Sequence, residues 1–283
     1  MTISKIKAES VLICSDLHLS PENLPIANFF CDWVTKYCLR GDLKEKPQWL
    51  LILGDLFDHW VGDDLIYSEK RYSFEKVIKS LKECFLSLKK LDISIGIMHG
   101  NRDFLMGDQL LSHIYAKQLA PMVKLQFNES KDEILLVHGD ELCTDDIQHQ
   151  VFRKMVQTSD WKKKFESKPL IARQKIAGSL RASSEEGKKL KSMEIMDVNP
   201  KAVETLLKKN NAYMLIHGHT HLPGKTTLPS GRLRWVIPNW TFDDYGNALA
   251  IDSFDNISVT GFTYGSLDEN ESKGGSDIFF VKF

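Results

Sequence analysis

Clusters of Asp, His and Asn recur along the sequence, and each cluster directly follows a short apolar run. They occupy residues 15–18, 54–58, 99–103, 138–140 and 217–221. Carboxylate, amide and imidazole groups are ligands for divalent metal ions. One cluster alone is weak evidence, because an Asp-x-His sequence is more often a capped turn than a ligand pair. Five clusters in this order predict a metal site.

The number and type of these side chains indicate which metals they would hold. The clusters offer two carboxylates, one amide and four imidazoles, which are too many ligands for one ion. Two ions about 3.5–4 Å apart would use all of them if one carboxylate bridges the pair. Because oxygen and nitrogen donors are mixed and no thiolate is included, Mn²⁺, Fe²⁺ or Zn²⁺ fits better than Mg²⁺ or a Cys-rich structural zinc site. Such a pair polarises a phosphoryl oxygen and supplies hydroxide near neutral pH.

The apolar runs are the elements that must position these ligands. Their length and their content of Ile, Leu and Val are typical of strands buried on both faces. They cover residues 11–14, 49–53, 93–98, 134–137 and 213–216, and further strands are expected at 235–238, 248–251 and 257–262. Amphipathic stretches at 26–39 and 74–91 predict helices between the early strands. Alternating strands and helices indicate an α/β fold, in which ligands bind at the carboxyl ends of the strands.

The same clusters match the signature blocks of a known family. Asp-x-His, Gly-Asp, Gly-Asn-Arg-Asp, a lone His and Gly-His-x-His occur in this order between residues 11 and 221. In these blocks the chain resembles the calcineurin-like metallophosphoesterases. Longer stretches resemble, within that family, the pyrophosphohydrolases that act on UDP-2,3-diacylglucosamine in lipid A biosynthesis. These stretches are residues 13–19, 53–64, 99–105, 138–146 and 195–199.

The resemblance implies a fold and a division of the chain. We expect an α/β fold of the metallophosphoesterase type, a two-sheet sandwich flanked by helices, with an inserted helical lid. Residues 9–148 and 210–264 would form the core, and residues 149–209 would form the lid. Residues 265–283 are left as a C-terminal extension, whose first part, 265–276, is rich in Gly, Ser, Asp and Glu and is expected to be a loop.

Carried over from the family block by block, the metal ligands fall into two sites. The first site would use Asp16, His18, Asp55 and His219, and the second would use Asp55, Asn101, His138 and His217. Asp55 is therefore expected to bridge the two ions. The implied cofactors are two divalent metal ions, with Mn²⁺ as the first choice.

Arg102 helps to choose among the reactions of the family. Many relatives have a His at this place, which can protonate a leaving group. Arginine cannot act as a general acid, because its pKa exceeds about 12, but it can clamp a phosphate with two hydrogen bonds. Arg102 therefore favours a leaving group that departs without a proton, such as the phosphate of a pyrophosphate. The alternative is that Arg102 pairs with Asp103 or another carboxylate and is structural.

The resemblance implies hydrolysis of UDP-2,3-diacylglucosamine to 2,3-diacylglucosamine 1-phosphate (lipid X) and UMP. Water activated by the two ions is expected to attack the α phosphorus, next to the uridine. The residues expected to act in catalysis are Asp55, Asn101, Arg102 and His217. The expected substrate contacts are Asn101, Arg102, Asp146, Ser184, Lys188, Lys191 and His217. Lys188 departs from the Asn expected there, so its side chain either contacts phosphate or points to solvent.

Two other interpretations of the sequence remain open. One is another nucleotide pyrophosphatase or phosphodiesterase on the same scaffold. The other is a metal-bound scaffold that no longer catalyses, which the complete ligand set disfavours.

Composition limits the partners of the protein. The chain has 283 residues and a net charge of −1. Residues 151–209 contain 15 Lys and Arg against 7 Asp and Glu, a net of +8, so the other residues carry −9. With no extended basic track, nucleic acid is not an expected partner. The basic segment instead fits an anionic lipid substrate and a membrane surface.

The basic segment and the cysteines bear on where the protein works. Lys162–164 lie beside Trp161 and Phe165, which fits either a membrane-surface patch or a solvated charge run. Five scattered cysteines without a CxxC pair indicate reduced thiols in a cytosolic protein. No apolar run approaches the roughly 18 residues that span a membrane, and the N-terminus has no signal-peptide core. We therefore expect a cytoplasmic protein, peripheral on the inner membrane of a Gram-negative bacterium, without an obligate protein partner.

Overall fold

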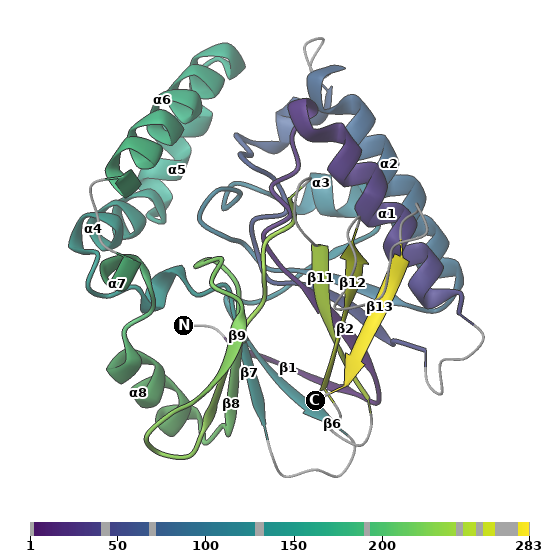
Figure 1. Ribbon diagram of the computed structural model, residues 1–283. Coiled ribbons are helices and arrows are strands. Elements are labelled where there is room, and N and C mark those ends of the chain that lie inside the picture. Colours follow the sequence, from purple (N-terminus) through teal and green to yellow (C-terminus); the bar gives the residue numbers. More distant parts are fainter. Residues whose placement is uncertain are drawn as a thin grey trace.

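Two β-sheets pack face to face, and helices cover their outer surfaces (Figure 1). This computed structural model describes residues 3–40, 46–67, 72–127, 133–189, 193–241, 246–252, 257–263 and 277–282. The loop expected at 265–276 lies outside the described residues. The expected α/β fold with two sheets between helices is confirmed.

The seven-stranded sheet holds the first three ligand loops. Its strand order is β13-β12-β11-β2-β3-β4-β5. The strands are β2 (Val11–Cys14), β3 (Trp49–Ile52), β4 (Ser94–Ile97), β5 (Lys117–Gln118), β11 (Gly246–Ile251), β12 (Ile257–Thr263) and β13 (Asp277–Lys282). β2 to β5 are parallel, and β11 to β13 add antiparallel strands at one side. In register, Leu12 pairs with Leu50 and Leu50 with Ile95, so the parallel strands end level with one another.

The six-stranded sheet holds the last two ligand loops. Its order is β1-β6-β7-β8-β10-β9. The strands are β1 (Ile3–Ala8), β6 (Met122–Phe127), β7 (Ile134–Val137), β8 (Met214–His217), β9 (Gly224–Thr227) and β10 (Leu233–Val236). β7 and β8 are parallel, which places His138 and the turn after His217 side by side.

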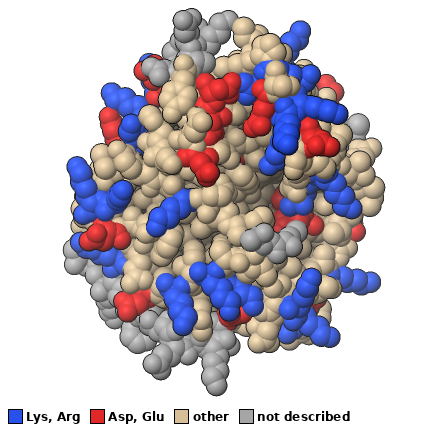
Figure 2. Space-filling model, turned by 180° about the vertical axis from the view of Figure 1, so that it is seen from behind, with Lys and Arg blue, Asp and Glu red and all other residues tan. Residues whose placement is uncertain are grey.

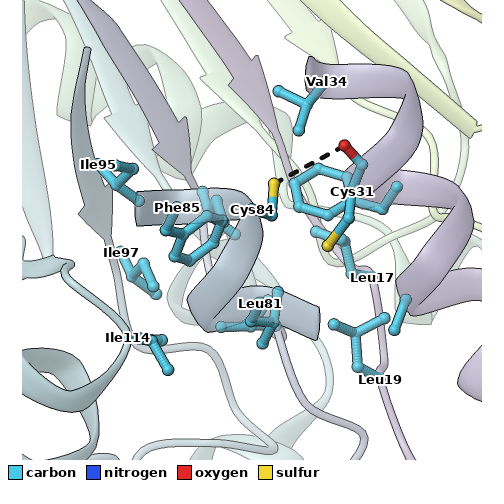
Figure 3. Packing of buried hydrophobic residues seen from close by; sticks show 14 of the residues in the cluster. Leu17, Leu19, Cys31, Val34, Leu81, Cys84, Phe85, Ile95, Ile97 and Ile114 are labelled. Atoms are coloured by element: carbon cyan, nitrogen blue, oxygen red, sulfur yellow. Dashed lines mark hydrogen bonds between the residues drawn. The ribbon is translucent and has the colours of Figure 1, made fainter. Parts of the chain in front are cut away.

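Three apolar layers hold these elements together. Ile13, Leu51 and Leu125 belong to the core between the two sheets. On the outer face of the seven-stranded sheet lie the helices α1 (Leu24–Cys38), α2 (Tyr72–Lys90) and α3 (Asp108–His113). Figure 3 shows this layer, where the Cys84 thiol of α2 donates to the Cys31 carbonyl of α1 at 3.7 Å. On the outer face of the six-stranded sheet, α8 (Pro200–Asn210) packs through Val203 and Leu207.

Four helices stand to one side of the sandwich and form the upper left of Figure 1. They are α4 (Ile147–Val156), α5 (Ser159–Glu166), α6 (Leu170–Lys189) and α7 (Met193–Met196), and we call them the lid helices. Arg173 of α6 is 2% exposed and docks the lid on the core, because its guanidinium donates to the Val61 carbonyl at 2.5 Å and to the Asp64 carboxylate. Among the described helices, none is long and apolar enough to cross a membrane.

Short strands with polar residues were not predicted from the sequence. β1 alternates exposed and buried residues, and β5 has only two residues, both exposed. The expected strand at 235–238 is β10, which lies two residues earlier, at Leu233–Val236. α8 lies in the range expected for the lid, but it packs on the six-stranded sheet.

Candidate metal centre and the cavity under the lid helices

All five ligand clusters lie at one edge of the sandwich, at the carboxyl ends of their strands. Backbone hydrogen bonds join the first two loops, because Asp16 N donates to Gly54 O at 3.1 Å and His18 N to Asp55 O at 3.0 Å. A further bond, from Gly218 N to His138 O at 3.0 Å, joins the last two. The sheet registers therefore bring the loops together before any side-chain contact is considered.

The loops place several ligand side chains on a backbone with positive φ. Asp16, His18, Asp55 and His219 have φ angles of 55°, 48°, 51° and 66°. For residues with a Cβ atom this conformation costs on the order of 1–3 kcal/mol, so the surrounding structure must hold it. Such conformations cluster at functional sites.

Gly54 allows the β3 loop to pass close to its neighbours. Its φ is +91°, and a Cβ atom there would lie 2.6 Å from His138 Nδ1 and 2.8 Å from the backbone of Gly100. Only glycine avoids both the strain and the contact.

Asp16, His18 and Asp55 form the first part of the centre. Asp16 Oδ1 lies 3.8 Å from His18 Nε2, and Asp55 Oδ2 lies 3.9 Å from His18 Nδ1. This Nδ1 atom is buried and has no hydrogen-bond partner among the described residues. A buried nitrogen without a partner requires an explanation. A divalent cation held by this nitrogen and a carboxylate would provide one.

Asn101, His138 and His219 form the second part. Asn101 Oδ1 lies 3.0 Å from His138 Nε2 and 2.9 Å from His219 Nδ1. His138 Nδ1 donates to the Leu53 carbonyl at 2.8 Å, which fixes the ring with Nε2 toward the centre. Asp55 Oδ1 lies 3.8 Å from His138 Nε2, so Asp55 stands between the two parts. This position supports the bridging role that we expect for it.

His219 was expected in the first site, and it contacts both parts. Its backbone N donates to Asp16 Oδ2 at 2.8 Å, whereas its ring lies beside Asn101. The ring centroids of His138 and His219 are 5.1 Å apart.

The ring of His217 makes its closest contacts away from the other expected ligands. Nδ1 donates to the Gly218 carbonyl at 2.8 Å, so Nε2 accepts from Arg234 Nε at 2.9 Å. Arg234 also donates to both carboxylate oxygens of Asp197, at 2.5 and 3.2 Å. His217 is fully buried, and its roles in catalysis and substrate binding remain predictions.

The protonation states suit metal binding. Burial lowers the pKa of both His18 and His217 to about 4 and also lowers the pKa of His219, so these rings are neutral near pH 7. A neutral imidazole offers a lone pair to a metal. Burial also acts to lower the pKa of His138, but the charges of Asp55 and Asp16 outweigh it and raise that pKa to about 9. A cation in the centre would replace the proton of His138.

His221 joins the centre although its position in the sequence predicted no ligand role. Its Nε2 lies 3.3 Å from Asp16 Oδ1 and 3.2 Å from His18 Nε2. Among the described His, Cys, Asp and Glu residues, two groups are close enough to hold an ion: Asp16 with His18 and His221, and Asp16 with Asp55 and His138. The signal for His221 was the Gly-His-x-His block itself, which here is Gly218-His219-Thr220-His221 and contains His221 but not His217.

Arg102 lines the cavity beside the metal centre, and its guanidinium lies close to two carboxylates. Its Nη1 donates to Asp58 Oδ1 at 2.8 Å, and its Nε lies 3.8 Å from Asp55 Oδ2. The carboxylate that pairs with Arg102 is therefore Asp58, not Asp103. Asp103 is fully buried and instead accepts from the backbone N of Leu56 and Gly100, at 2.8 Å each. Burial, together with the charge of Asp55, raises the pKa of Asp103 to about 7.

A cavity of about 510 Å³ lies between the metal centre and the lid helices. Asp55, Asn101, Arg102 and His219 line its polar end. Of the other expected substrate contacts, Asp146 and Ser184 also line it. Asp146 in addition caps α4, because its Oδ1 accepts from His149 N at 3.0 Å. The side chain of Lys188 and the whole of Lys191 lie outside the described residues.

The lining of the cavity also contains a group of apolar side chains, most of them from the lid helices. This group includes Leu105, Phe152, Val156, Phe165 and Leu180. Trp161 stacks on Phe165 with ring centroids 4.8 Å apart and also contacts Phe104 of the core at 5.9 Å. Trp161 and Phe165 therefore help to dock the lid on the core, and a membrane-surface role for Lys162–164 stays a prediction.

The fold and the centre together define a class of protein. The family model for calcineurin-like phosphoesterase matches residues 10–223, and the chain belongs to this family. The chain thus carries the donor groups for a dinuclear site of divalent metals.

Among its relatives are proteins named UDP-2,3-diacylglucosamine hydrolase. The relative from Bordetella pertussis is 37% identical over 82% of this chain and 85% of its own length. Those from Cellvibrio japonicus and Klebsiella pneumoniae are 32% and 33% identical, over 87% and 90% of this chain and 99% and 100% of their own lengths.

Solved structures give a more distant likeness. A dimetal phosphatase from Danio rerio is 13% identical, with a TM-score of 0.47 over 95% of this chain and 98% of that one. A zinc complex of Vps29 from Entamoeba histolytica is 12% identical, with a TM-score of 0.46 over 96% and 98%. Both TM-scores are below 0.5, so family membership rests on the sequence matches.

Proposed function

We propose that this protein hydrolyses the pyrophosphate of UDP-2,3-diacylglucosamine to UMP and 2,3-diacylglucosamine 1-phosphate in lipid A biosynthesis. The names of relatives that match it over 82–90% of the chain support the proposal. The structural observation that carries it is the lining of the cavity, which combines metal-binding groups and Arg102 with a group of apolar side chains, most of them from the lid helices. An acylated sugar nucleotide has a matching combination, because its diphosphate is anionic and its acyl chains are apolar.

Two divalent ions, which we propose to be Mn²⁺, would supply Lewis-acid polarisation of a phosphoryl oxygen and a hydroxide nucleophile near neutral pH. The residues that would hold them are Asp16, His18, Asp55, Asn101, His138, His219 and His221. His221 takes the place that we expected for His217, because both ring nitrogens of His217 are engaged by Gly218 and Arg234. The oxygen and imidazole donors fit Mn²⁺. The nearby Cys143 thiol is engaged elsewhere, because it donates to the Met196 carbonyl at 3.4 Å.

Arg102 stabilises the charge that develops on the transferred phosphorus. Its guanidinium keeps its proton throughout, so it binds phosphoryl oxygens and cannot protonate the leaving group. In the proposed reaction water attacks the α phosphorus, and the bond to the bridging oxygen breaks. The leaving group is then a sugar phosphate, which needs no proton to depart. Asn101 lies beside Arg102 in the cavity wall and would contact the same phosphoryl group.

The lid helices, together with the loop before them, would hold the rest of the substrate. We propose that Asp146, Ser184, Lys188 and Lys191 contact the sugar phosphate and that Phe152 and Leu180 contact the acyl chains. Ser184 and Leu180 lie one helical turn apart on α6. One face of this helix can therefore contact both the sugar phosphate and the acyl chains.

The lid also has an exposed apolar edge. Ile147, Val151 and Met155 follow one another at every fourth position of α4 and are 66%, 63% and 48% exposed. From behind, in Figure 2, Lys and Arg side chains gather over the lid helices at the upper right, and others lie along the lower edge. We propose that the edge of α4 rests on the cytoplasmic face of the inner membrane, from which the substrate would enter the cavity.

Mass spectrometry of the products tests the reaction. The purified protein is incubated with UDP-2,3-diacylglucosamine and Mn²⁺ in ¹⁸O-labelled water. The expected result is label in UMP, because water attacks the phosphorus that UMP retains. Label in the lipid product alone would contradict attack at the α phosphorus.

The competing interpretation, a nucleotide pyrophosphatase or phosphodiesterase of broad range, is tested in the same assay. UDP-glucose and a cyclic nucleotide replace the acylated substrate at equal concentration. If either is hydrolysed as fast as UDP-2,3-diacylglucosamine, the lid does not select a lipid and the proposed substrate is wrong.

A further inference from the structure

Asp58 is a buried carboxylate that contacts one arginine from the metal centre and one from the lid. Its side chain is 4% exposed. Oδ1 accepts from Arg102 Nη1 at 2.8 Å, and Oδ2 accepts from Nη1 of Arg181 in α6. The ring of His59 lies beside the same carboxylate, with Nδ1 3.5 Å from Oδ2.

The backbone around Asp58 is fixed to the core. Asp58 N donates to the Leu19 carbonyl at 3.1 Å, and Phe57 forms a bridge with Leu19. Trp60 N donates to the carbonyl of Arg102 at 3.2 Å, which joins this loop to the loop after β4. The carboxylate of Asp58 is therefore a rigid reference point, against which the two arginine side chains are placed.

On the lid side, Arg181 lies where α6 carries its expected substrate contacts. Arg181, Ser184 and Lys188 are spaced at i, i+3 and i+7, so they share one face of the helix. The first half of α6 is docked by Arg173, eight residues earlier, which is about 12 Å along the helix axis. Arg181 fixes the second half, and Asp58 is the group that it contacts on the core.

Two arginines and two carboxylates lie at this junction. Asp58 is shared between two guanidinium groups, and Asp55, the expected metal ligand, is the other carboxylate near Arg102, at 3.8 Å from its Nε. Arg102 and Arg181 both line the cavity. The contact with Arg102 is the more shielded of the two, because the side chain of Arg102 is 17% exposed and that of Arg181 is 51% exposed.

We propose that Asp58 is a positioning residue that couples the lid to the phosphate clamp. It holds the guanidinium of Arg102 beside the metal centre, and through Arg181 it holds the second half of α6 over the same point. The proposal rests on the proposed function, in which Arg102 binds the reacting phosphate and α6 binds the sugar phosphate. Removal of Asp58 would disturb both, whereas removal of Arg181 would disturb only the lid.

Steady-state kinetics with UDP-2,3-diacylglucosamine separate these effects. For Arg181→Ala we expect KM to rise about ten-fold with kcat within two-fold of the wild type. For Asp58→Ala we expect the same rise in KM and a fall in kcat of about ten-fold, because Arg102 loses its partner as well. The double variant should be no worse than Asp58→Ala, and Asp58→Glu should recover part of kcat. Additive losses in the double variant would overturn the coupling.

Hydrogen exchange of the ligand-free protein provides a readout that does not depend on the substrate. Amides in the second half of α6, residues 178–189, should exchange faster in Asp58→Ala and in Arg181→Ala than in the wild type. Asp32→Ala is the matched control, since Asp32 is an exposed carboxylate of α1, and it should change neither exchange nor kinetics. Equal exchange in all four proteins would contradict the role of Asp58 in holding the lid.

The two tests fail in different ways. If the wild type does not hydrolyse the acylated substrate, the proposed function is wrong, and the exchange data still decide whether Asp58 holds α6. If the wild type is active and both variants match it, the positioning role alone is wrong. Should Asp58→Ala fail to fold, Arg181→Ala still gives both readouts, because its side chain is half exposed. Metal content, measured after dialysis against Mn²⁺, should be unchanged in every folded variant, since Asp58 is not among the expected ligands.

Discussion

The metal centre and the lid differ in what holds their functional side chains in place. In the centre, Asp16, Asp55 and His138 are almost fully buried, and their loops are joined by backbone hydrogen bonds. On the lid, the side chains of Ser184 and Arg181 are exposed, and the position of α6 depends on side-chain contacts made by Arg173 and Arg181. Strand register sets the first arrangement, and a few ion pairs together with a small apolar cluster around Phe165 set the second.

This difference has a functional meaning. A dinuclear metal site needs ligands held to within a fraction of an ångström, which a backbone framework provides. The lid is attached to the core through fewer buried contacts, and elements attached in this way move more readily than a core. The protein thus combines a rigid reaction centre with a cover that is held by contacts it can release.

The largest effect on activity is expected from Asp55→Asn. This substitution removes the negative charge of the carboxylate that stands between the two parts of the metal centre. Because Asp55 lies 3.9 Å from His18 Nδ1 and 3.8 Å from His138 Nε2, both ions would lose a carboxylate ligand. We expect kcat to fall at least a hundred-fold, which corresponds to about 2.7 kcal/mol or more. The measurement is turnover of UDP-2,3-diacylglucosamine with added Mn²⁺, together with bound metal per chain. Near-normal turnover would rule out the two-metal arrangement.

A smaller effect, on stability, is expected from Gly54→Ala. The alanine would have to adopt a φ of +91°, and its Cβ would lie 2.6 Å from His138 Nδ1. The backbone strain alone costs on the order of 1–3 kcal/mol. We expect the midpoint of urea unfolding to fall for the metal-free protein, and metal binding to weaken because the β3 loop must move.

Gly178→Ala on α6 is the matched control for that substitution. A Cβ at Gly178 meets nothing within 4 Å, and alanine favours a helix over glycine by about 1 kcal/mol. The same chemical change should therefore be neutral or slightly stabilising on the lid and destabilising in the centre. Equal losses at both glycines would remove the distinction between a centre fixed by its backbone and a lid that is not.

The same distinction explains what could be predicted from the sequence. Short apolar runs followed by Asp, His or Asn placed six of the seven expected ligands together, because strand ends determine where such residues lie. The pairing of Asp58 with Arg102 and Arg181 could not be predicted, since it joins residues 44 and 123 positions apart through side chains on separate elements. The contact of His217 with Arg234 was missed for the same reason. The contact of Trp161 and Phe165 with the core could not be predicted either, because an aromatic residue beside lysines has the same local pattern on a membrane edge and on a docking surface.

The smallest expected effect concerns the exposed edge of α4. Replacing Ile147 and Val151 with Ser removes two side chains that are 66% and 63% exposed and make little contribution to the core. If this edge enters a membrane interface, each side chain buries apolar area worth on the order of 1 kcal/mol, so binding to vesicles that contain anionic lipid should weaken about ten-fold or more. Activity on substrate dispersed in detergent should stay within two-fold. Leu39→Ser, at an exposed position after α1, is the control and should leave vesicle binding unchanged. Equal vesicle binding by all three proteins would place the membrane contact elsewhere, whereas a loss confined to the α4 variant would show that the lid, and not the metal-bearing sandwich, meets the membrane.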